Sequence, residues 1–174
     1  MFRGSPRGTA VWGSAITGIA DGKLNGLRVH ALRAEGRLAP GVSLGLRLRT
    51  MRRATHRDPL VVCSVETAKA WATAVDDGLV SPAVLREVHR DALEIVSRRR
   101  PWTVCTDPAQ AALFTFSRIG CQLHQHDSLT DHLGREVDLS FFSPGFLCLV
   151  ARQAAQAASD VMVLRRLQAP WGDR

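Results

Sequence analysis

Residues 58–98 decide the fold class, and their sequence is DPLVVCSVETAKAWATAVDDGLVSPAVLREVHRDALEIVSR. Asp58 followed by Pro59 is typical of a helix that begins with an N-cap aspartate and a proline in its first turn. Apolar side chains then recur at steps of three and four residues, which predicts an amphipathic helix that runs to about Val75. The polar turn at 76–78, which contains a glycine, predicts its end.

The same start signal, serine or aspartate before proline, recurs further along the chain at 81–82, 107–108 and 143–144. It predicts helices over residues 82–98, 109–119 and 144–167. The loop between the helix in 58–75 and the next helix is short, so we expect the two to pack as an antiparallel hairpin. The side chains expected to face the core from the second of them are Val84, Leu85, Val88, Ala92, Ile95 and Val96.

The N-terminal patterns are shorter. Asp21 can cap a helix over 22–35, whereas residues 43–54 fit either a helix or a strand, of which we favour the helix. Further along, alternating apolar and polar residues predict a β-hairpin near residues 121–141 with its turn at 131–135. The expected fold class is therefore α+β and mainly helical, with five to six helices and one hairpin.

Length and composition are those of one globular domain. With 174 residues, of which 45% are apolar and 22% charged, we expect a single domain over 1–174 with a frayed tail at 169–174. Charged or polar residues interrupt every apolar run, so we expect no membrane span and no cleaved secretion signal. The four cysteines are widely spaced, which is typical of reduced thiols in an intracellular protein, nuclear or cytoplasmic.

Positive charge is concentrated in the N-terminal third. Residues 1–57 contain eleven Lys and Arg against two Asp and Glu, a net charge of +9, whereas residues 58–174 contain twelve against fourteen, a net charge of −2. Arginine pairs with phosphate through two parallel hydrogen bonds, so the backbone of RNA or DNA is the expected partner. The alternative is a solvated basic face that only keeps the protein soluble. The candidate binding residues are Arg28, Arg33, Arg37, Arg47, Arg49, Arg52, Arg53 and Arg57.

Motifs for nucleotide hydrolysis and for metalloproteolysis are absent, because the sequence contains neither a GxxxxGKS/T phosphate loop nor an HExxH pair. One local group has the chemistry of metal ligands: Cys121, His124, His126 and His132. Across a hairpin these four side chains could form a tetrahedral zinc site, and a small zinc-binding protein is therefore one of three hypotheses for the function. Their spacing matches no common zinc finger, so we expect no bound metal. Because the phosphate-loop and metalloprotease motifs are absent as well, we expect no enzyme and no other cofactor.

Several segments resemble the region that follows the reverse-transcriptase palm in polyproteins of non-LTR retrotransposon type. They are Val11-Trp12-Gly13-Ser14-Ala15-Ile16-Thr17-Gly18 with Asp21, Leu24, Leu27 and Arg28, the run 113–120, the turn Asp131-His132-Leu133-Gly134 and the helix start Ser143-Pro144. The resemblance implies a helical stretch between a polymerase and a ribonuclease H domain. The paired aspartates of the polymerase and the carboxylates of ribonuclease H have no counterpart in the chain, so no catalytic residue is carried over.

These observations predict a non-catalytic, thumb-like or connection-like domain fragment of a retroelement reverse transcriptase that contacts a nucleic-acid backbone without sequence preference. The alternative is a protein-interaction module without nucleic-acid binding, whose partner is the polymerase or ribonuclease H domain of a parent polyprotein.

Overall fold

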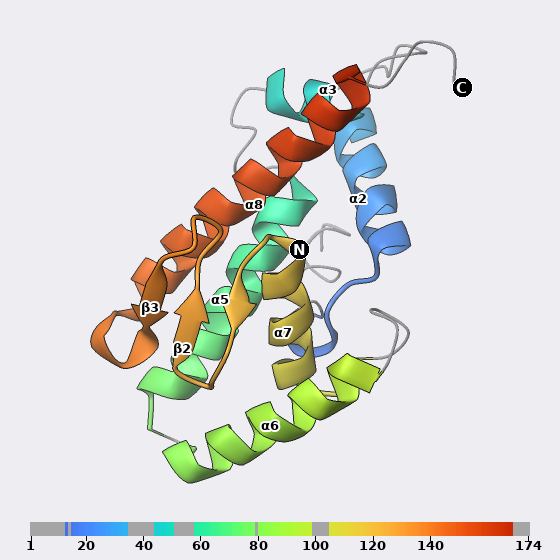
Figure 1. Cartoon of the computed structure of the whole chain (residues 1–174). Helices are drawn as coiled ribbons and strands as arrows, with labels where there is room; N and C mark the ends of the chain where they lie inside the picture. Colours follow the sequence, from blue (N-terminus) through green and yellow to red (C-terminus); the bar gives the residue numbers. More distant parts are fainter. Residues whose placement is uncertain are drawn as a thin grey trace, which may run out of the picture.

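The computed structural model describes residues 13, 15–34, 44–50, 58–78, 80–98 and 105–168. These residues form six α-helices and a small antiparallel sheet, which confirms the mainly helical α+β class (Figure 1). The helices are α2 (Asp21–Ala34), α3 (Leu44–Thr50), α5 (Pro59–Asp76), α6 (Pro82–Arg98), α7 (Pro108–Arg118) and α8 (Pro144–Gln168). The strands are β1 (Gln122–Leu123), β2 (Ser128–Thr130) and β3 (Glu136–Asp138), and a 3-10 turn η1 (Leu139–Phe141) precedes α8.

Helix starts follow the local signals of the sequence. The carboxylate of Asp58 accepts a hydrogen bond from the backbone N–H of Leu60 at 3.0 Å, and that of Asp107 accepts one from Gln110 at 2.9 Å. Both aspartates therefore satisfy backbone donors that have no partner within the first turn of a helix. Residues 44–50 are helical, which confirms the helix alternative for that part of 43–54.

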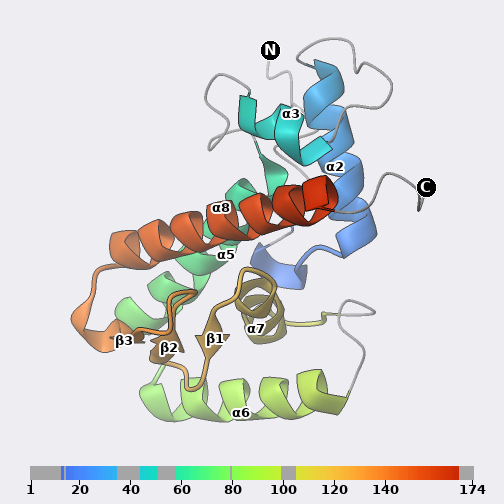
Figure 2. The same ribbon diagram turned by 45° about the horizontal axis from the view of Figure 1, so that its top comes forward.

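Helices α5 and α8 pack side by side through the middle of the molecule (Figures 1 and 2). They run antiparallel, because Asp58 at the start of α5 contacts Ser159, whereas Val65 further along contacts Cys148. Small residues on α8 allow this close approach, since Ala151, like its neighbours Ala154 and Ala155, has no exposed surface. The pair forms the centre of the core.

The predicted antiparallel pairing of α5 with α6 is wrong. Helix α6 lies against α7 and crosses the end of α5 instead of running along it (Figures 1 and 2). Helix α8 packs along α5 instead, with Leu147 and Val150 in the same buried cluster as Leu60, and burial of apolar area decides which helix packs there. As a result, three side chains of α6 that were expected in the core are exposed: Val84, Val88 and Ile95.

The predicted hairpin is part of a three-stranded antiparallel sheet in the order β1-β2-β3. Its turn at 131–135 lies between β2 and β3, as predicted, and Leu129 pairs with Val137 across these two strands. The additional strand, β1, follows Gly120, whose φ of 79° lies in the left-handed region that favours glycine. This residue turns the chain from the end of α7 into the sheet.

The core is formed by α5, α7, α8 and the inner face of the sheet. Its largest fully buried side chains include Phe116, Leu60, Leu129 and Leu147. Within α8, residues Pro144–Arg165 are long and apolar enough to span a membrane by length and composition alone, contrary to expectation. The same segment supplies much of the buried face that α5 covers, as the central helix of a helical domain does. The tail at 169–174 lies outside the described residues.

Candidate nucleic-acid interface

One end of the molecule is formed by the last turns of α2, by α3 and by the last turns of α8. Helix α3 contacts both α2 and α8, and the two longer helices converge toward it (Figures 1 and 2). Leu48 of α3 is only 1% exposed and anchors the short helix at this junction. We call this junction the basic end, because three exposed arginines lie on its helices: Arg33, Arg47 and Arg165.

Arg33 and Arg47 are the two predicted binding residues whose side chains the structure shows as exposed. Within the described part of the chain, neither forms an ion pair. Arg33 lies in the last turn of α2, where a cation also stabilises the negative end of the helix dipole. Both side chains are therefore exposed and unpaired among the residues that the structure describes.

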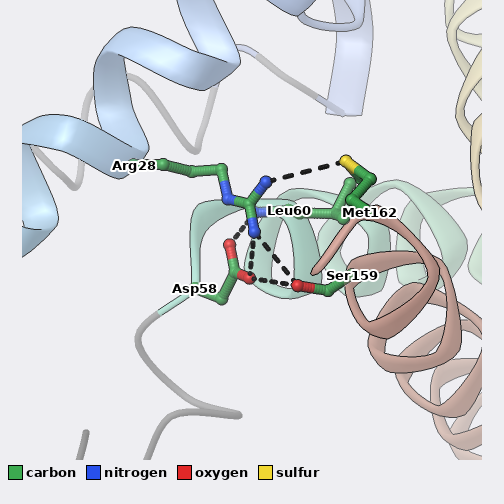
Figure 3. A network of polar contacts seen from close by, with 5 residues as sticks. All are labelled: Arg28, Asp58, Leu60, Ser159 and Met162. Atoms are coloured by element: carbon green, nitrogen blue, oxygen red, sulfur yellow. Dashed lines mark hydrogen bonds and ion pairs between the residues drawn. The ribbon is translucent and has the colours of Figure 1, made fainter. Parts of the chain in front are cut away.

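Arg28 has a different role from the predicted one. Its side chain is 4% exposed, and its Nη2 lies 3.0 Å from the carboxylate of Asp58 and 3.0 Å from the hydroxyl of Ser159 (Figure 3). A buried guanidinium that is already paired with a carboxylate cannot reach a phosphate in solution. The prediction of Arg28 as a backbone contact is corrected on this ground, because its charge is neutralised inside the protein.

The structure does not describe the side chains of the remaining predicted arginines. Arg49 belongs to α3, next to the buried Leu48. The other four lie outside the described residues: Arg37, Arg52, Arg53 and Arg57.

Arg165 was missed by sequence reasoning, although it is exposed in the last turns of α8, a helix that contacts α3. It lies one turn beyond Met162, whose sulfur is 3.9 Å from Nη1 of Arg28 on α2. Its sequence neighbours identify it only as part of an amphipathic helix. More than a hundred residues separate it from the basic N-terminal third, so only the packing of α3 against both α2 and α8 brings the helices that carry these arginines together.

The four candidate zinc ligands do not form a metal site. Among the described residues, no group of three or more His, Cys, Asp or Glu side chains is placed to hold a metal ion. Cys121 is fully buried, and burial raises the pKa of its thiol to about 11, so the thiolate that zinc requires is disfavoured. Nε2 of His124 lies 2.8 Å from the hydroxyl of Thr130 on β2, and this hydrogen bond already occupies that nitrogen.

His126 and His89 belong to a buried contact between α5, α6 and the sheet. Nε2 of His89 lies 3.2 Å from the backbone carbonyl of Leu123, and the indole N–H of Trp71 donates to the carbonyl of His126 at 3.0 Å. Burial lowers the pKa of His89, and the hydrogen bond to Leu123 opposes this effect only in part. These contacts fix α6 to the body of the protein.

Residues 41–45, GVSLG, match the GxSxG pattern of serine hydrolases. In those enzymes the serine lies on a sharp turn between a strand and a helix. Here the described element before this segment is helix α2, and α3 starts at Leu44. Ser43 itself lies outside the described residues.

No family model, no curated protein and no solved structure matches the chain. The resemblance to the region after a reverse-transcriptase palm therefore stays a prediction, and function is argued from the residues alone.

Proposed function

We propose that this protein is a non-catalytic helical domain that binds the backbone of RNA or DNA without sequence preference through its basic end. Exposed arginines on three helices, Arg33, Arg47 and Arg165, carry the proposal. The net charge of +9 in residues 1–57 against −2 in the rest of the chain agrees with it. The resemblance to retroelement polyproteins suggests the same role, that of a connection-like fragment beside a polymerase.

The ion pairs of the described residues distinguish the basic end from the other arginine-rich surface, on α6. There Arg98 lies 2.6 Å from Glu94, and Arg90 lies 3.5 Å from Asp91. Neighbouring acids thus compensate the positive charge of α6, whereas Arg33 and Arg47 have no such neighbour in the described part of the chain. A polyanion is attracted most strongly to the uncompensated charge.

Arginine suits this role for a geometric reason. Its planar guanidinium donates two parallel hydrogen bonds to one phosphate, and each phosphate that it neutralises releases a counterion from the nucleic acid. Binding of this kind reads no base edges, so affinity should be similar for unrelated sequences and should fall steeply with salt.

The test is filter binding of a labelled RNA and a labelled DNA at low salt with two charge-reversed double variants. We expect R33E/R47E to lose most of the retention of the parent protein, and the plot of log affinity against log salt to become shallower by about two units. The matched control is R90E/R98E, which changes the net charge equally but on α6. It should retain most of the binding. Equal losses in both variants would contradict the proposal, because net charge alone would then govern retention.

A second candidate function is the protein-interaction module. One observation favours it: Val84, Val88 and Ile95 form an exposed apolar stripe on α6, a helix that lies at the other end of the molecule from α3 (Figure 1). The expected partner is a polymerase or ribonuclease H domain of a parent polyprotein. In that case R33E/R47E binds such a domain as the parent does, whereas V88D abolishes binding, which pull-down with each purified domain measures.

A further inference from the structure

A buried polar network joins three helices just below the basic end. Nη2 of Arg28 on α2 donates to the carboxylate of Asp58 and to the hydroxyl of Ser159, each at 3.0 Å (Figure 3). The same carboxylate caps α5 through the N–H of Leu60 and accepts the hydroxyl of Ser159 at 3.3 Å. One aspartate thereby connects α2, α5 and α8 at a single point.

This ion pair is unusual among those of the described residues, because both its side chains are almost fully buried, at 4% and 5% exposure. The other pairs keep at least one partner in contact with solvent, as Arg135 does in its pair with Asp131. A buried ion pair adds little net stability, since the cost of removing two charges from water offsets their attraction. Here the cost is higher still, because Nε of Arg28 is buried without a hydrogen-bond partner.

Such a network instead restricts α2 to one position against α5 and α8. Apolar side chains on α2 could pack in several registers, whereas the guanidinium has to meet one carboxylate and one hydroxyl. Arg33 lies five residues after Arg28 on the same helix, so the register of α2 determines where the Arg33 guanidinium stands.

We propose that Arg28 and Asp58 are positioning residues: their buried ion pair fixes α2 in one register and so places Arg33 on the basic end. This inference deepens the proposed function and, for its effect on affinity, rests on it. Arg28 then acts on nucleic-acid binding without touching the nucleic acid, which accounts for the burial of an arginine from the basic third.

The test uses the double variant R28M/D58S. It keeps the net charge, keeps a good N-cap residue on α5 and replaces the guanidinium by an apolar side chain of similar length. We expect the thermal midpoint to stay close to that of the parent and the peptides of α2 to exchange their amide hydrogens faster, while those of α5 and α8 stay protected. We also expect the slope of log affinity against log salt to become shallower by about one unit, as it would for the loss of one phosphate contact.

Two further variants separate a positioning role from a general loss of stability or charge. In a chain that already carries R33E, the double variant should change affinity no further, because its effect passes through Arg33. The control E94S/R98M removes an exposed ion pair of α6 at the same net charge and should leave exchange and affinity unchanged. Unchanged exchange of α2 in R28M/D58S would overturn the inference. A parent protein that binds no nucleic acid would refute the proposed function, while exchange of α2 would still decide the role of the ion pair.

Discussion

His89 is a buried titratable side chain whose protonation opposes folding. Its ring lies between Trp71 and the backbone of Leu123, and its pKa is influenced by the charges of His126, Asp127 and His124. Burial lowers the pKa of His89 because the charged imidazolium loses water, and His126 and His124 also lower it, against the opposing effects of the Leu123 carbonyl and Asp127. The unfolded chain therefore binds a proton on this residue at a higher pH than the folded protein does.

The expected consequence is an acid-sensitive fold. The unfolded state takes up more protons below the ordinary histidine pKa of about 6.5, so the free energy of unfolding should fall as the pH drops from about 7 toward 5. Urea unfolding across this range measures it, with H89Q as the comparison, since glutamine keeps a donor for the carbonyl of Leu123. The loss on acidification should be smaller in H89Q. A parent and a variant with the same pH dependence would contradict the role given to His89.

Helix caps are the elements that local sequence specifies best. Asp107 accepts the N–H of Gln110 at 2.9 Å, and Pro108 begins α7, so the start of this helix depends on neighbours only three residues apart. The caps at Asp58 and Asp107 and the turn at 131–135 were predictable for the same reason. The partner of each helix was not, because it depends on which apolar faces bury most area in the whole fold.

The cap of α7 provides a prediction at this scale. We expect D107A to lower the free energy of unfolding by about 1 kcal/mol, since the N–H of Gln110 loses its acceptor. Chemical denaturation of D107A beside D91A measures it, because Asp91 is an exposed aspartate in the interior of α6. A D107A variant as stable as D91A would show that the cap contributes nothing.

The basic end is a property of the whole molecule. Sequence identified the basic third and therefore Arg33 and Arg47, but neither the burial of Arg28 nor the position of Arg165 could be predicted from it. Arg28 pairs with an aspartate 30 residues away and contacts a serine 131 residues away, and such distances carry no periodic signal. The apolar residues Val84, Val88 and Ile95 of α6 were wrongly expected in the core for a similar reason. Amphipathic spacing predicts that a helix has an apolar face, but it does not predict which element covers that face.

The salt dependence of nucleic-acid binding by the parent protein tests the central claim most directly. Affinity should be measured for unrelated RNA and DNA oligonucleotides of equal length between about 50 and 200 mM salt, the range in which phosphate contacts weaken strongly. The account predicts measurable binding at the lowest salt, similar affinities for the different sequences and a steep fall as salt rises. No retained RNA or DNA at low salt, or an affinity that salt does not change, would contradict it.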